Sequence, residues 1–68
     1  MNAPLLFRIE ACNPDQKLDW FTVHGFEGVE KRQQVIDTAR SMRNHMDEAF
    51  IVRIIERQGD AEEVIWKE

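Results

Sequence analysis

The sequence lacks several features that would point to a compartment or a membrane. Its one cysteine, Cys12, cannot form a disulfide within the chain, so we expect a reducing compartment. No apolar run approaches the roughly 20 residues that a transmembrane helix needs. The N-terminus shows no charged segment followed by an apolar one, as a signal peptide would. These absences predict a cytoplasmic protein that makes no membrane contact.

Basic residues are too few for a general binder of duplex nucleic acid. Nine lysines and arginines stand against 13 aspartates and glutamates, which gives a net charge of −4. Affinity for a duplex comes largely from cations that neutralise phosphates. The composition therefore argues against duplex binding and leaves room for a local basic patch.

Patterns of catalytic and metal-binding residues are absent as well. Cys12, His24 and His45 are the candidate nucleophiles, bases or metal ligands, but their spacing matches neither C-x-x-C nor H-x-x-x-H. The only serine, Ser41, lies in a predicted helix, so no Ser-His-Asp arrangement is indicated. The glycines at 25 and 28 are too close together for a phosphate-binding loop. We predict no enzymatic activity, no cofactor and no metal.

Simpler roles are available for these three side chains. Cys12 is expected to be a small buried or half-buried hydrophobe at a strand end. His45 is expected to be a solvated side chain near a helix end, where a cation is favourable. His24, beside a glycine, suits a pH-sensitive contact at an interface as well as it suits a base.

The length and composition indicate one small folded domain over residues 1–68. Apolar residues make up 43% of the chain and charged residues 32%, which is typical of a folded soluble protein. Met1 to Pro4 are predicted to form a loose N-terminal segment. A chain of this size buries only about 60% of the surface of its unfolded form. Oligomerisation would supply additional burial.

The longest periodic segment, residues 28–48, predicts an amphipathic helix that ends between Asn44 and Ala49. At 100° per residue, apolar side chains share one face and polar side chains the other. The apolar face comprises Val35, Ala39, Met42 and Met46. The helix is therefore expected to lie on an apolar surface.

Four other segments alternate with the period of a β-strand. They are residues 5–12, 18–24 or 25, 49–57 and 62–67, with turns at 13–15 and 58–60. The order β-β-α-β-β predicts a two-layer α+β fold, with one helix packed on a four-stranded, mainly antiparallel sheet. The spatial order 2-1-3-4 makes every neighbouring pair antiparallel and the crossover right-handed. The order 1-2-3-4, with parallel middle strands, is the alternative.

The alternation assigns each strand residue to one of the two faces of the sheet. The inner face, under the helix, is predicted to hold Phe7, Ile9, Phe21, Val23, Phe50, Val52 and Ile54. The outer face is predicted to hold Leu6, Arg8, Glu10, Trp20, Thr22, His24, Ile51, Arg53, Ile55 and Arg57, with either Trp66 or Ile65.

The outer face is unusually apolar and aromatic for a surface in contact with water, and such patches mark interaction sites. We predict a non-enzymatic interaction module, of the regulator, inhibitor or adaptor type, that binds a protein partner or itself, most simply as a homodimer. One alternative is single-stranded nucleic acid held by aromatic residues and arginines. Another is a small enzyme or ligand binder built at a dimer cleft. The candidate binding residues are Leu6, Arg8, Trp20, His24, Ile51, Arg53, Ile55 and Arg57.

Overall fold

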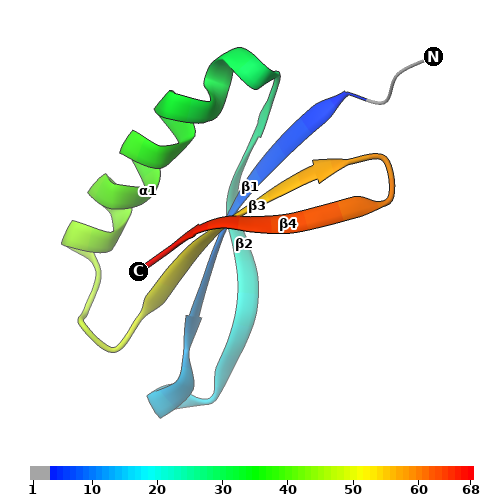
Figure 1. Ribbon diagram of the computed structural model, residues 1–68. Coiled ribbons are helices and arrows are strands. Elements are labelled where there is room, and N and C mark those ends of the chain that lie inside the picture. The colour runs from blue at the N-terminus through cyan, green and yellow to red at the C-terminus, as the bar shows by residue number, and fades with distance from the viewer. Residues whose placement is uncertain (1–3) are drawn as a thin grey trace.

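The computed structural model describes residues 4–68 and consists of a four-stranded antiparallel sheet with one helix packed against one face (Figure 1). The elements are β1 (Leu5–Asn13), β2 (Leu18–Glu27), α1 (Arg32–His45), β3 (Ile51–Gln58) and β4 (Ala61–Lys67). The strands lie in the order β2-β1-β3-β4. The predicted α+β fold and the predicted order 2-1-3-4 are confirmed, and the order 1-2-3-4 is wrong. The predicted loose segment at the N-terminus falls, apart from Pro4, outside the described residues.

The helical segment between β2 and β3 opens with a 3₁₀ turn, Val29–Lys31, that leads into α1. The turn follows Gly28, whose φ of 107° lies in the region that favours glycine. The helix ends at His45, within the predicted range. Within residues 4–68, no helix is both long enough and apolar enough to cross a membrane.

Strand β3 begins two residues later than the sequence predicts. The backbone N–H of Phe50 donates to the carbonyl oxygen of Asp47 at 3.0 Å. The N–H of Ala49 donates to the Asp47 carboxylate at 2.9 Å. These bonds hold a tight turn between α1 and β3, so the extended backbone starts only at Ile51.

The core lies between α1 and the inner face of β1 and β3. Val35 and Ala39 are fully buried, which confirms the centre of the predicted apolar face of the helix. The Arg32 guanidinium lies 6.0 Å from the centroid of the Phe7 ring. It also donates to the Glu56 carboxylate at 2.6 Å and so ties the start of α1 to β3. The buried core cluster is Phe7, Ile9, Ala11, Val35, Ala39, Val52 and Ile54.

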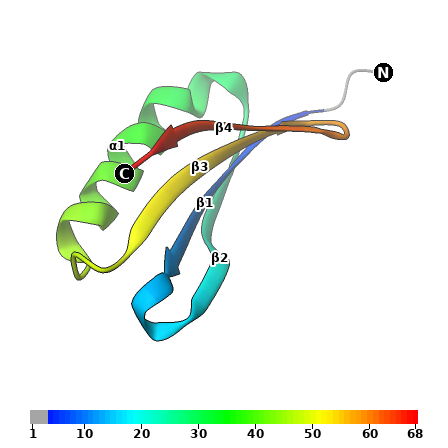
Figure 2. The same ribbon diagram turned by 60° about the horizontal axis from the view of Figure 1, so that its bottom comes forward.

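Phe21 was predicted to belong to this core, and that prediction is wrong. Its side chain is 43% exposed. The helix packs mainly on β3 and β1, and the turn that joins β1 to β2 extends past the end of α1 (Figure 2). The inner side of β2 near this turn therefore has no helix above it.

We expect Ala39→Asp to unfold the domain. The substitution places an unpaired charge at a position with no solvent exposure. It should cost about 4 kcal/mol or more, against a total stability of roughly 3 to 10 kcal/mol for a chain of this length. Urea unfolding followed by circular dichroism measures the loss.

The matched control is Gln34→Asp, at an exposed position in the first turn of α1. A negative charge there is favourable to the helix dipole, so the change in stability should stay within about 0.5 kcal/mol. Similar stabilities for the two variants would mean that the buried face of the helix is misassigned.

Candidate functional site

The outer face of the sheet is the side that α1 does not cover. Strands β1 and β3 run through its centre, and their register places Leu6 opposite Arg57 and Glu10 opposite Arg53. Trp20 of β2 lies over the same surface, with its ring centroid 3.8 Å from the Arg53 Cζ. The structure thus brings together seven of the eight predicted binding residues: Leu6, Arg8, Trp20, Ile51, Arg53, Ile55 and Arg57.

His24 does not lie on this face, so the prediction that placed it there is wrong. Ile9 of β1 is opposite His24, but the next residue, Glu10, is opposite Thr22. Strand β2 therefore has one more residue than β1 here, and this bulge shifts the alternation of side chains by one position. The His24 ring meets the Phe26 ring edge-on, with 4.6 Å between the centroids.

A second bulge changes the outer face at β4. Ile54 is opposite Trp66, whereas Ile55 is opposite Val64, so one residue of β4 is unmatched. Trp66 and Ile65 both pack against the core. The expectation that one of them lies on the outer face is wrong, and Val64 takes that place.

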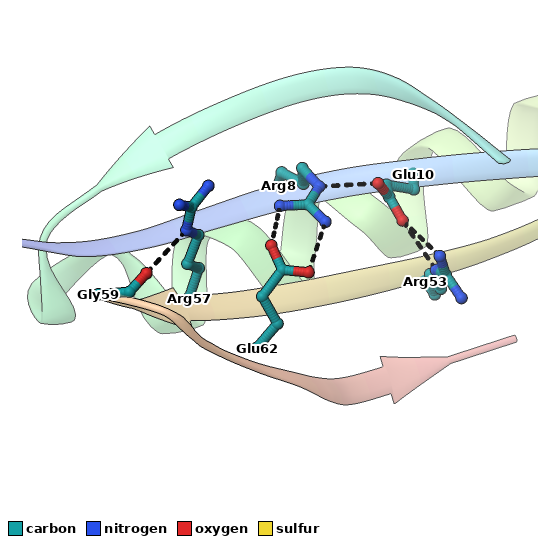
Figure 3. A network of polar contacts seen from close by, with 6 residues as sticks. All are labelled: Arg8, Glu10, Arg53, Arg57, Gly59 and Glu62. Atoms are coloured by element: carbon teal, nitrogen blue, oxygen red, sulfur yellow. Dashed lines mark hydrogen bonds and ion pairs between the residues drawn. The ribbon is translucent and has the colours of Figure 1, made fainter.

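A network of ion pairs covers the centre of the outer face (Figure 3). The Glu10 carboxylate accepts hydrogen bonds from Arg8 Nε at 2.7 Å and from Arg53 Nε at 2.8 Å. The two terminal nitrogens of Arg8 donate to the Glu62 carboxylate at 2.9 and 3.2 Å. Glu10 is only 7% exposed, and both of its oxygens have a charged partner.

The network sets the protonation of its members. Burial by itself would raise the pKa of Glu10, but hydrogen bonds from Arg8 and Arg53 outweigh it and hold this pKa below its usual value. A hydrogen bond from Arg8 likewise lowers the pKa of Glu62. Hydrogen bonds to Glu62 and Glu10 raise the pKa of Arg8, so its guanidinium group is always charged.

The outer face is less apolar in space than its sequence suggests. Ile55 is only 5% exposed and Cys12 is buried, so the network side chains cover much of the apolar surface. Leu6 and Val64 remain 38% and 46% exposed. The apolar area available for contact is therefore confined to a few positions at the side of the network.

Leu6 borders a hollow of about 270 Å³. Its lining includes Leu6, Arg8, Ile55 and Arg57, and Gly25 of β2 lies opposite Arg8. A Cβ added at Gly25 would have the Phe7 carbonyl oxygen, at 3.8 Å, as its nearest neighbour. The hollow exists because the residue opposite Arg8 has no side chain.

Arg57 is the cation at this hollow with most of its hydrogen-bonding capacity unused. Its Nε donates to the Gly59 carbonyl oxygen at 2.9 Å. Among residues 4–68 its terminal nitrogens have no hydrogen-bond acceptor, whereas those of Arg8 are both engaged by Glu62. In Figure 3 the Arg57 side chain leans from β3 across β1.

The candidate residues for catalysis or metal binding do not come together. Cys12 is buried, and His45 Nδ1 lies 2.7 Å from the Ser41 carbonyl oxygen on the exposed side of α1. Within the described part of the chain, no group of three histidine, cysteine or carboxylate side chains could hold a metal ion. Comparisons with protein-family models, curated proteins and solved structures found no match to this chain. The candidate site on the outer face is therefore described from the contacts of this structure alone.

Sequence reasoning missed three residues of this site: Gly25, Glu62 and Val64. A hairpin turn at Gly59 and Asp60 pairs Arg57 with Glu62, and this pairing places Glu62 on the outer face. That signal was available in the sequence. The same alternation along β4 places Val64 on this face, two residues after Glu62, whereas the hollow at Gly25 depends on which side chains surround it.

We expect Glu10→Gln to destabilise the fold by about 1 to 3 kcal/mol, because two guanidinium groups lose their charged acceptor. Urea unfolding at pH 7 measures the difference. The control is Glu63→Gln, an exposed carboxylate on β4, which should change stability by no more than about 0.5 kcal/mol. Equal effects of the two substitutions would contradict a stabilising role for the network.

The network should also make the stability depend on pH in the acid range. The pKa values of Glu10 and Glu62 are lowered in the fold from a reference value of 4.5. Their contribution is fully present above that value and is lost as the pH falls through the folded pKa values. Thermal melts between pH 7 and pH 2 should show a steep loss of stability below pH 4.5, and Glu10→Gln should make it shallower.

Proposed function

We propose that this chain is a non-enzymatic binding module that attaches to a protein partner through the outer face of its sheet. One observation carries the proposal. Exposed Leu6 and the open donors of Arg57 border the same hollow, on the face that α1 does not cover. An apolar contact beside an available guanidinium is typical of residues that anchor protein interfaces.

The charge of this face indicates an acidic partner. Arg8, Arg53, Arg57 and Lys67 contribute four positive charges to it, while three carboxylates, at positions 10, 27 and 62, contribute negative ones. The face thus carries one net positive charge on a chain whose total is −4. Interfaces place opposite potentials against each other.

Self-association is the second version of the proposal. A two-fold dimer built on this face would bring two surfaces of the same net charge together, which is unfavourable. The burial of Ile55 and Cys12 within a single chain also reduces the gain from covering the face with a second copy. A different, acidic protein therefore fits the outer face better than another copy does.

Single-stranded nucleic acid fits this face less well than a protein. The Trp20 ring already stacks against the Arg53 guanidinium at 3.8 Å, and Lys67 Nζ lies 5.9 Å from the same ring. Stacking of a base on the ring face that Arg53 covers would displace Arg53 from both Trp20 and Glu10.

We expect Arg57→Glu to weaken partner binding at least about tenfold, because it reverses the charge of the most available donor group. The matched control is Arg40→Glu, the same change at an exposed position of α1. Immobilised wild-type and variant proteins are incubated with extract of the source cells, and the retained proteins are quantified by mass spectrometry. Sedimentation of the wild type measures self-association in parallel.

The proposal requires a protein that wild type and Arg40→Glu retain and that Arg57→Glu loses, with equal thermal stability of all three. A protein lost from Arg40→Glu and retained by Arg57→Glu would move the binding surface to the helix. A wild type that sediments as a dimer, insensitive to Arg57→Glu, would reject this face as the contact between copies.

A further inference from the structure

We propose that the hollow at Gly25 is a specific subsite for one apolar side chain of the partner, with an adjoining carboxylate bound by Arg57. This inference rests on the proposed function and adds the chemistry of the partner segment. The hollow of about 270 Å³ is open to solvent and lies on the uncovered face of the sheet.

The volume of the hollow is better matched to a single side chain than to a whole small-molecule ligand. Pockets that enclose a small-molecule ligand usually measure about 300 to 1,000 Å³. The hollow at Gly25 is below that range. Leu6 and Ile55 supply apolar walls, and the bare backbone of Gly25 lets a group approach β2 closely. One aliphatic or aromatic side chain fits these dimensions.

The guanidinium groups at the rim of the hollow favour a carboxylate ligand over a phosphate. Arg8 is already neutralised, because it bonds to both Glu10 and Glu62. Of the two arginines that line the hollow, only Arg57 has terminal nitrogens without an acceptor among the described residues, and one guanidinium matches one carboxylate in a paired, parallel geometry. A phosphate carries a higher charge and would meet the Glu62 carboxylate next to this single available cation.

Titration of the ¹⁵N-labelled protein with N-acetyl-phenylalanine tests the subsite. The probe combines one apolar side chain with one carboxylate, and N-acetyl-phenylalanine amide is its uncharged counterpart. We expect saturable shifts of the Gly25 and Leu6 amides and of the Arg57 Nε–H. The amide probe should bind about tenfold more weakly, since a charged hydrogen bond is lost.

Two substitutions separate the apolar and the charged parts of the subsite. Gly25→Val fills the hollow with a residue that favours strands, so the fold persists while binding falls at least about tenfold. Arg57→Gln should lower affinity for the carboxylate probe to that of the amide probe. Lys67→Gln, which removes another cation of the same face, should leave binding unchanged.

Equal binding of the two probes, or full binding by Gly25→Val, would overturn the subsite. The same shifts produced by inorganic phosphate at lower concentration would also overturn it, in favour of a phosphate ligand. A probe that fails to bind while Arg57→Glu still loses a protein partner would reject the subsite and leave the proposed function standing. A probe that binds as expected while no partner is retained would reject the proposed function and leave the subsite standing.

Discussion

The Glu10 carboxylate, held between the guanidinium groups of Arg8 and Arg53, is the interaction on which the outer face depends. In a two-layer fold one side of the sheet has no second layer to cover it. Here long arginine side chains lie over the apolar positions and their charged ends converge on one carboxylate. The charge of Glu10 is nearly buried and both of its oxygens are paired, so the network leaves no unpaired buried charge at this carboxylate.

This pairing also determines which part of the face remains available. Glu62 engages the remaining terminal nitrogens of Arg8, and Trp20 lies against Arg53. Arg57 lies beyond these contacts, next to the position where Gly25 leaves a gap. The accessible chemistry of the outer face is therefore local: one guanidinium beside one apolar hollow.

The two edge strands carry the irregularities of the sheet. Both β2 and β4 contain bulges, while β1 and β3 pair in unbroken register. Bulges at edges limit the addition of further strands, and they also redirect side chains. They turn His24 away from the outer face and draw Trp66 towards the core. Addition of a further strand at either edge is thus disfavoured.

The sequence by itself determined the order of elements and the buried sides of α1 and β3. These follow from local periodicity: Val35 and Ala39 recur at helical spacing, and Val52 and Ile54 at strand spacing. Only the tertiary structure decided the positions of His24, Phe21 and Trp66. A bulge is a property of two paired strands, and the cover over β2 depends on where α1 crosses the sheet, so neither is encoded in the alternation of one strand.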